Sequence, residues 1–143
     1  MRCLRVFRCL GLLLGLLLLG SVASAQDPVA PRVDLVFFGT SSCPTCAGWK
    51  RFDYPKLKEA PGFQRVHFTE VIKSIQAPIP PASDFPAEIA GYHDAIADRF
   101  HGAIGSPMFA LLVNGAVVDA WRGTRRSNEQ ILAEVDKAFA SNP

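Results

Sequence analysis

The sequence predicts an α/β domain in which helices flank a mixed central sheet. Three observations support this prediction: a continuous apolar run at residues 35–38, an Asn-Gly pair between two apolar segments, and helical periodicity in other segments. The expected order is strand, helix, strand, helix, strand, strand, helix (β-α-β-α-β-β-α), which gives the sheet a parallel part and an antiparallel hairpin. With 143 residues and 49% hydrophobic content, the sequence has room for one packed domain.

The first 25 residues differ from the rest and are expected to be a signal peptide. Three arginines lie among the first eight residues, residues 10–19 are apolar, and Ala23-Ser24-Ala25 offers small side chains to a signal peptidase. We expect cleavage after Ala25, export to the periplasm, and a folded domain at residues 26–143. An uncleaved membrane anchor is the alternative, but an apolar core of ten residues is shorter than the about 20 residues that span a bilayer.

Charge and cysteine content narrow the function classes. Removal of residues 1–25 leaves 12 basic and 13 acidic side chains, a net charge of −1, so no nucleic-acid partner is expected. Cys3 and Cys9 lie in the leader, and the remaining two cysteines, Cys43 and Cys46, are three positions apart. Oxidation of thiols is normal outside the cytoplasm, so this pair is a candidate redox centre.

Four segments have the patterns of strands. The apolar run at 35–38 predicts a strand that is buried on both faces. Residues 64–71 alternate between apolar and polar side chains, which predicts a second strand. Residues 108–113 and 116–121 flank Asn114-Gly115, a pair that supplies the positive φ angles of a tight type I′ turn, so these two segments are expected to form a hairpin.

A helix is expected to begin at the cysteines, because Pro44 suits the first helical turn, where its missing N–H would be unpaired in any case. Trp49 and Phe52 repeat at helical spacing from Cys46. This spacing predicts that Cys46 lies on the inward face of the helix together with both aromatic side chains. Pro55 is expected to kink or end the helix.

Two more helices follow a proline-rich segment. Four prolines between residues 76 and 86 exclude regular structure there and predict a stiff loop inserted in the domain. Apolar periodicity predicts a helix at about 87–101 with Gly102 as its terminator. Ser127, followed by Gln130 three residues later, has the spacing of a capping box and predicts the start of the last helix.

The spacing of Cys43 and Cys46 suits thiol-disulfide exchange. A thiol attacks a disulfide as the thiolate, and the unpaired backbone N–H groups at a helix N-terminus stabilise that form. Cys43 has this position, so it is expected to attack. Cys46 lies within one helical turn, so it is expected to resolve the mixed disulfide by forming the Cys43–Cys46 bond.

Other uses of a C-x-x-C motif fit less well. A static disulfide across so short a loop stabilises the fold weakly. Haem attachment needs a histidine directly after the second cysteine, where Ala47 stands. No metal or cofactor is expected, and no pairing of cysteine with histidine suggests a hydrolase. A zinc site would need two more ligands, and no paired zinc-finger spacing occurs among His67, His93 and His101.

The domain resembles the thioredoxin-like superfamily over essentially its whole length after the leader. The resemblance rests on the buried strand, the C-P-T-C motif at a helix start, and Ser106-Pro107 directly before the hairpin. It implies that Pro107 is cis and that Ser106 offers backbone hydrogen bonds to a bound substrate strand. It also places Gly123, Pro44 and Thr45 at the same substrate groove.

Finer similarities and two departures follow from this comparison. Pro44-Thr45 is similar to the dipeptide of exported thioredoxin-like reductases, including those that serve cytochrome c maturation. Trp49 completes a C-x-x-C-x-x-Trp pattern that is similar to small periplasmic proteins linked to sulfur oxidation. Phe37 stands where a buried acidic residue is common, so proton transfer to Cys46 must use another group, and Ser42 replaces a common tryptophan.

We therefore expect a periplasmic thiol-disulfide oxidoreductase that acts on the disulfide of a protein substrate, more as a reductase than as an oxidase. Its own dithiol would be restored by a redox partner protein, for which a membrane-bound donor is one candidate. Two alternatives stay open. One is a module that binds copper or another soft metal through both thiolates. The other is a non-catalytic adaptor that docks a partner through the 76–86 loop.

Overall fold

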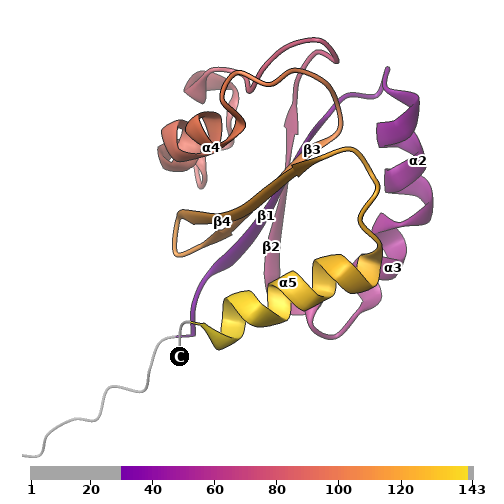
Figure 1. Cartoon of the computed structure of the whole chain (residues 1–143), viewed down its shortest axis with the longest axis vertical. Helices are drawn as coiled ribbons and strands as arrows, with labels where there is room; N and C mark the ends of the chain where they lie inside the picture. Colours follow the sequence, from indigo (N-terminus) through magenta and orange to yellow (C-terminus); the bar gives the residue numbers. More distant parts are fainter. Residues whose placement is uncertain (1–29, 142–143) are drawn as a thin grey trace, which may run out of the picture.

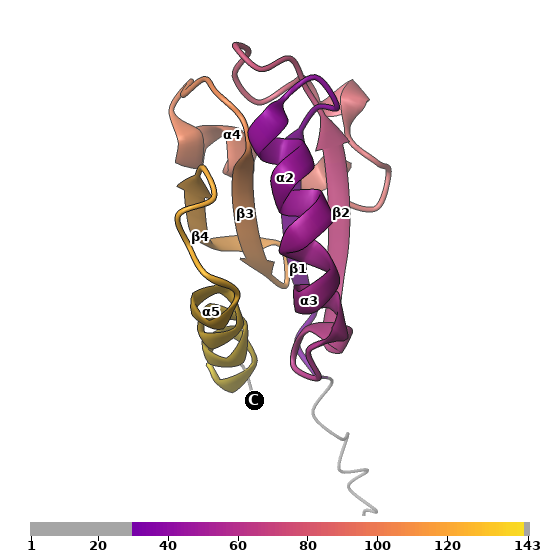
Figure 2. The ribbon, with the colours of Figure 1, turned by 90° about the vertical axis from the view of Figure 1, so that its right-hand side faces the viewer.

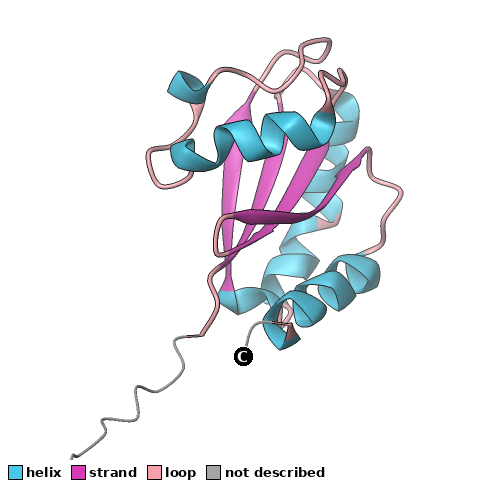
Figure 3. Cartoon of the chain, turned by 60° about the vertical axis from the view of Figure 1, so that its left-hand side comes forward, coloured by secondary structure: helices cyan, strands magenta, loops and turns pink. Residues whose placement is uncertain are grey.

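The computed structural model describes residues 30–141, so the predicted signal peptide at residues 1–25 lies outside the described residues (Figure 1). The described part contains no helix that is long and apolar enough to cross a membrane. Its strands and helices follow the predicted order with one additional short helix, Tyr54–Glu59, and helices lie on both sides of the sheet (Figure 3). The strands and helices are β1 (Val33–Gly39), α2 (Pro44–Phe52), α3 (Tyr54–Glu59), β2 (Val66–Ile72), α4 (His93–Phe100), β3 (Met108–Val113), β4 (Ala116–Arg122) and α5 (Asn128–Ala140).

The sheet has the strand order β2-β1-β3-β4. β1 pairs in parallel with β2 and antiparallel with β3, and β3 pairs antiparallel with β4, which confirms the predicted mixed sheet. All seven residues of β1 are buried, as its continuous apolar pattern predicted. The strand begins at Val33, two residues before the predicted run, because its pairing with β2 and β3 begins there. It includes Asp34, which is buried in an ion pair with Arg32.

The core consists of two apolar clusters, one on each face of the sheet. α2, α3 and α5 cover one face, and α4 with the proline-rich loop covers the other (Figures 1 and 2). Alternate residues of β1 serve the two clusters, so that Leu35 and Phe37 point to the first and Val36 and Phe38 to the second. The cysteine pair belongs to the first cluster.

The helix that carries the cysteines departs from the prediction at its end. The prediction that Phe52 points inward is wrong, because 60% of this residue is exposed. A step of three residues turns the helix by less than a full turn, so two such steps from Cys46 move Phe52 off the buried stripe. The interruption expected near Pro55 is present. α2 ends at Phe52 and α3 begins at Tyr54, so Pro55 lies in the first turn of α3, where its missing N–H is tolerated.

The segment before α4 contains two further corrections. A short 3₁₀ turn, Ala82–Asp84, interrupts the loop at 76–86, where no regular structure was predicted. The helix predicted at 87–101 begins only at His93, after a 3₁₀ turn at Ala90–Tyr92, because Ile89 has a non-helical backbone. Its C-cap is the left-handed His101 (φ 49°) rather than Gly102.

Local signals at the hairpin and at the last helix are confirmed. Asn114 and Gly115 both have positive φ angles, 49° and 83°, as a type I′ turn requires. At the start of α5, Ser127 Oγ accepts a hydrogen bond from the Gln130 N–H and Gln130 Oε1 accepts one from the Ser127 N–H. This is the capping box that the sequence predicted.

Candidate active site

The cysteine pair lies at the point where β1 passes into α2. The Thr40–Ser42 turn follows the strand, and the Cys43 N–H donates to the Thr40 carbonyl at 3.2 Å. Cys43 is the N-cap of α2, with an extended backbone (φ −94°, ψ 112°), and Pro44 occupies the first helical turn. The Cys46 N–H donates to Cys43 Sγ at 3.2 Å. The sequence therefore forms the thiol-bearing helix start that its spacing predicted.

Cys43 and Cys46 form a disulfide, with Cα atoms 5.2 Å apart. Cys43 is 3% exposed and Cys46 fully buried, so Cys43 is the cysteine of the pair that solvent reaches. Pro44 and Thr45, between them, are exposed. A partner that reaches the disulfide therefore meets these two residues first.

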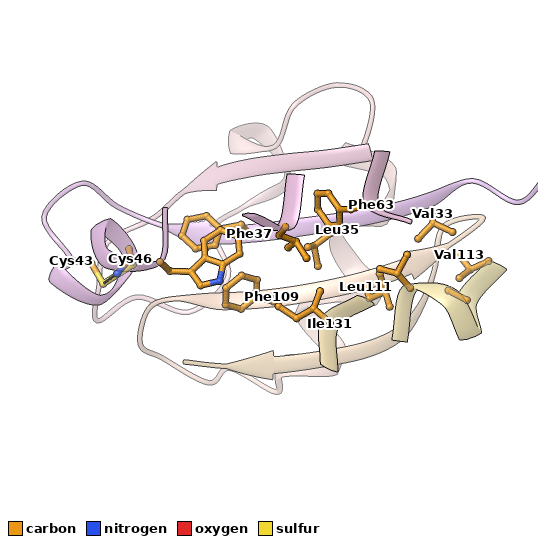
Figure 4. Packing of buried hydrophobic residues seen from close by; sticks show 14 residues of the cluster. Val33, Leu35, Phe37, Cys43, Cys46, Phe63, Phe109, Leu111, Val113 and Ile131 are labelled. Carbon is orange, nitrogen blue, oxygen red and sulfur yellow. Dashed lines mark hydrogen bonds between the residues drawn. A yellow bond between two sulfur atoms is a disulfide. The ribbon is translucent and has the colours of Figure 1, made fainter. Parts of the chain in front are cut away.

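Aromatic side chains lie directly behind the disulfide (Figure 4). Phe37 stacks on Trp49 with ring centroids 5.0 Å apart, and Phe109 meets both rings edge-on at 5.2 and 5.0 Å. A Cβ atom at Gly39 would lie 2.5 Å from the Phe37 ring and 3.3 Å from Cys46 Sγ, so the ring and the sulfur are close neighbours. Phe37 thus lies next to Cys46, at the position where the resemblance predicts a buried acidic residue.

The segment before β3 faces the cysteines. The Ser106–Pro107 peptide bond is cis, which confirms the prediction. The Ser106 carbonyl oxygen lies 3.8 Å from Cys43 Sγ. Gly123 is fixed beside this segment, because its N–H donates to the Pro107 carbonyl at 2.8 Å. The structure therefore brings Ser106 to Cys43 and places Pro107 and Gly123 beside it, while the part of all three in substrate binding stays a prediction.

Two surface cavities adjoin this arrangement. One, of about 780 Å³, lies between the Thr40–Ser42 turn and the proline-rich loop, with Lys73 in its wall. The other, of about 510 Å³, has Ser106, Pro107 and Gly123 in its wall. The long loop therefore does form part of the surroundings of the site.

Lys73 is the site residue that sequence reasoning missed. It is only 4% exposed, and its Nζ donates to the Gly105 carbonyl at 2.7 Å and to the Ser74 carbonyl at 3.0 Å, with Ser106 Oγ at 3.3 Å. Burial lowers the pKa of Lys73. One signal was available in the sequence. Lys73 lies two residues after the end of the second predicted strand, and parallel strands bring their ends to the same sheet edge.

Charged side chains are scarce inside the domain. Within residues 30–141, the only buried charged side chains are Asp34 and Lys73. Asp34 pairs with Arg32 near the start of β1, whereas the cysteines follow its end. Across the described range, no group of three or more histidine, cysteine or acidic residues could hold a metal ion.

Comparisons with known proteins give structural similarity only. No family model matches the chain, and no curated protein sequence matches it. The structure is similar to the periplasmic thioredoxin SoxS from Paracoccus pantotrophus in its reduced form, with 14% identity, a TM-score of 0.49, and coverage of 75% of this chain and 98% of that one. It is also similar to thioredoxin-2 of a malaria parasite (17% identity, TM-score 0.49, coverage 75% and 84%) and to the long form of thioredoxin f from spinach chloroplast (18%, 0.45, 75% and 70%).

The topology of this chain carries the structural conclusion. The sheet is mixed, the C-x-x-C disulfide stands at the start of the helix after β1, and a cis-proline precedes β3 opposite the disulfide. The chain thus has an α/β thioredoxin-like fold with a C-x-x-C disulfide, an arrangement consistent with a thiol-disulfide oxidoreductase.

Proposed function

We propose that this protein is a periplasmic thiol-disulfide oxidoreductase that reduces a disulfide bond in a protein substrate. One observation carries the proposal: the Cys43–Cys46 disulfide caps α2 and lies opposite the carbonyl of Ser106, 3.8 Å from Cys43 Sγ. The predicted leader at residues 1–25 supports the periplasmic location. The resemblance of Pro44-Thr45 to exported reductases supports the reducing direction.

The two cysteines divide the reaction between them. In the reduced protein, the Cys43 thiolate attacks one sulfur of the substrate disulfide, and the other substrate sulfur leaves as a thiolate and takes up a proton. Cys46 then loses its proton, and its thiolate attacks Cys43 Sγ. The mixed disulfide breaks, the second substrate thiol is released, and the Cys43–Cys46 disulfide remains. Two electrons have passed to the substrate, and a dithiol donor must return them.

Position assigns the attacking role to Cys43. Its sulfur accepts the backbone N–H of Cys46 at 3.2 Å, and the positive end of the α2 dipole lies at the same place. Both effects favour a thiolate. Cys46 is fully buried, so a substrate reaches it only through Cys43. An extended substrate segment beside Ser106 would present its disulfide to Cys43.

The test combines a redox titration with substrate trapping. Protein expressed with its leader and purified from the periplasm is equilibrated with reduced and oxidised glutathione, and we expect one two-electron transition. The Cys46→Ser variant should accumulate a mixed disulfide with a peptide disulfide, because the resolving thiol is missing. Cys43→Ser serves as the matched control and should trap nothing. Absence of both the transition and the trapped species contradicts the proposal.

The direction of electron flow needs a separate measurement. The reduction potential from the same titration is compared with about −270 mV for a strong reductant and about −120 mV for a strong oxidant of this fold. A value closer to the first supports a reductase. A value closer to the second, together with faster oxidation of a peptide dithiol than reduction of the peptide disulfide, would reverse the proposed direction while leaving the exchange chemistry in place.

A further inference from the structure

Lys73 is a buried cation that the exchange chemistry does not use. Its three side-chain contacts are all neutral oxygens: the carbonyls of Ser74 and Gly105 and the hydroxyl of Ser106. No ion pair involves it in the part of the chain that the structure describes. A buried charge without a partner of opposite sign is costly, and neutral acceptors offset only part of that cost.

The position of Lys73 connects it to the attacking sulfur. Its backbone N–H donates to the Gly39 carbonyl at 3.0 Å, which ties it to the end of β1. Its ammonium group donates hydrogen bonds to the Gly105 carbonyl and the Ser106 hydroxyl, and the Ser106 carbonyl faces Cys43 Sγ. Lys73 is therefore separated from the sulfur of Cys43 by a single residue. Reduction of the disulfide gives a thiol at Cys43, and loss of its proton places a negative charge at that sulfur.

We propose that Lys73 is a positioning residue of the redox site, which holds the Gly105–Ser106 segment in place and stabilises the reduced state by placing its positive charge near the Cys43 thiolate. This inference rests on the proposed function, because it concerns the same cysteines. It follows that Lys73 makes the protein more oxidising and enlarges the thiolate fraction at neutral pH.

The other charges near the site fit this assignment. The first turn of α2 contains no acidic residue. On the side of β4, Arg122 reaches the Ile104 carbonyl at 3.5 Å and adds positive charge. Asp84 contributes to the wall of the same cavity as Lys73 but forms no ion pair with it. The lowered pKa of Lys73 agrees with a cation that has no carboxylate partner.

The test replaces the charge and then restores it. Lys73→Met keeps the length of the side chain without its charge, and Lys73→Arg keeps the charge. Lys56→Met, on the exposed surface of α3, is the matched control. We expect Lys73→Met to shift the equilibrium with glutathione about tenfold towards the disulfide, which is about 30 mV for two electrons. Its alkylation at pH 7 should slow to a similar degree, Lys73→Arg should recover most of both effects, and the control should match wild type.

A second measurement uses the unaltered protein, so that a folding defect of the variants does not decide the question. With isotope-labelled lysine, NMR follows the loss of the Lys73 proton with pH in the oxidised and in the reduced protein. We expect Lys73 to keep its proton to higher pH in the reduced protein, because the thiolate stabilises the ammonium. Identical titrations, or folded Lys73→Met with wild-type potential and alkylation, overturn the inference. Wild type without any redox transition would instead contradict the proposed function.

A different observation concerns the second cavity, where two arginines lie without an acidic partner among the described residues. Arg122 and Arg125 contribute to its wall together with Ser106 and Pro107, and no acidic residue does. Neither arginine forms an ion pair with any residue between 30 and 141. Arg126 is different, because it pairs with Asp119 and covers the Trp121 ring. Two guanidinium groups without a carboxylate partner among the described residues thus lie beside the segment that faces Cys43, and Arg122 contacts the neutral Ile104 carbonyl at 3.5 Å.

From this charge pattern we infer that the preferred substrate segment has an acidic side chain next to its disulfide-bonded cysteine. A guanidinium binds a carboxylate with two parallel hydrogen bonds, and a segment that lies along Ser106 would bring its neighbouring residue to this cavity. This inference also rests on the proposed function and specifies its substrate class.

Matched peptide disulfides test the preference. Three peptides differ only in glutamate, glutamine or lysine beside the cysteine, and kcat/KM is measured for each at low salt. We expect wild type to prefer glutamate over glutamine about tenfold, because hydrogen bonds to a charged group are stronger than neutral ones and solvent exposure reduces the difference. The Arg122→Gln, Arg125→Gln double variant should lose this preference, whereas Lys58→Gln on α3 should keep it. Equal kcat/KM values for the three peptides in active wild type overturn the inference and leave the exchange function standing.

Discussion

Gly39 lies at a position where any side chain would collide with the aromatic layer behind the disulfide. Its Cβ would stand 2.5 Å from the Phe37 ring, which cannot move away because it packs between Trp49 and Phe109. We predict that Gly39→Ala lowers the free energy of unfolding by about 1–3 kcal/mol, the usual cost of overpacking. Urea denaturation of the oxidised protein measures this change.

Gly48→Ala is the matched control for Gly39→Ala. Nothing lies within 4 Å of a Cβ at Gly48, which is in the interior of α2. Alanine is the better helix former, so this variant should gain about 0.5–1 kcal/mol. Opposite signs for the two variants are expected, and a loss at Gly48 equal to that at Gly39 would mean that steric crowding by Phe37 is not the cause.

Lys73 should give the stability of the oxidised protein a distinct pH dependence. Burial lowers its pKa in the folded state from the ordinary value of 10.5. Between the lowered pKa and 10.5 the unfolded chain binds more protons than the folded one, so the stability contributed by this residue rises with pH. We predict that wild type gains stability relative to Lys73→Met between pH 7 and pH 10.5, as measured by urea unfolding at each pH. Parallel curves for the two proteins would contradict the prediction.

Among the elements, α5 depends on its N-terminal cap. Ser127 and Gln130 each satisfy one backbone N–H of the other, and α5 packs Ile131 and Val135 onto the first cluster. We predict that Ser127→Ala costs about 1 kcal/mol of unfolding free energy, and that Gln130→Ala costs less. In a double-mutant cycle, the sum of the two single losses in unfolding free energy should exceed the loss in the double variant, because each single substitution already disrupts the same capping box. Strict additivity would show that the two hydrogen bonds act independently.

Local chemistry explains which elements could be predicted from the sequence. The hairpin at Asn114-Gly115 and the start of α5 depend on residues next to one another in the chain, so their patterns were sufficient. The start of α4 was predicted too early, because the periodicity of apolar residues does not separate a 3₁₀ turn followed by a helix from one longer helix. The prediction for Phe52 was wrong because each step of three residues falls short of a full helical turn. After two such steps from Cys46, the side chain no longer lies on the buried face of the helix.

Some residues of the candidate site could be predicted from the sequence, and one could not. Cys43 and Cys46 were predictable because their chemistry lies in their spacing, and Ser106-Pro107 because of a stated resemblance. Lys73 was not, since its importance arises from contacts with Gly39, Gly105 and Ser106, which are far from it in sequence. The pairing of β1 with both β2 and β3 brings these residues together. A polar contact of this kind leaves no periodic pattern in the sequence.

At the scale of the whole molecule, β1 and β3 are shared by both apolar clusters. Leu111 and Leu112 are consecutive in β3 and equally buried, yet Leu111 belongs to the cluster with the cysteines and Leu112 to the cluster under α4. Because the same two strands form one wall of each cluster, loss of either cluster removes support from the other. We therefore expect the described domain to unfold in one cooperative step.

This matched pair of leucines tests that expectation. Trp49 and Trp121 both pack in the first cluster, so tryptophan fluorescence reports on that face, whereas circular dichroism reports on helices of both faces. Leu111→Ala and Leu112→Ala should each cost about 2–5 kcal/mol. For Leu112→Ala the fluorescence and circular dichroism transitions should shift together, although no tryptophan lies on the altered face. A circular dichroism transition that moves while fluorescence stays in place would show that the α4 face unfolds separately, and the cysteine site would then be stable without it.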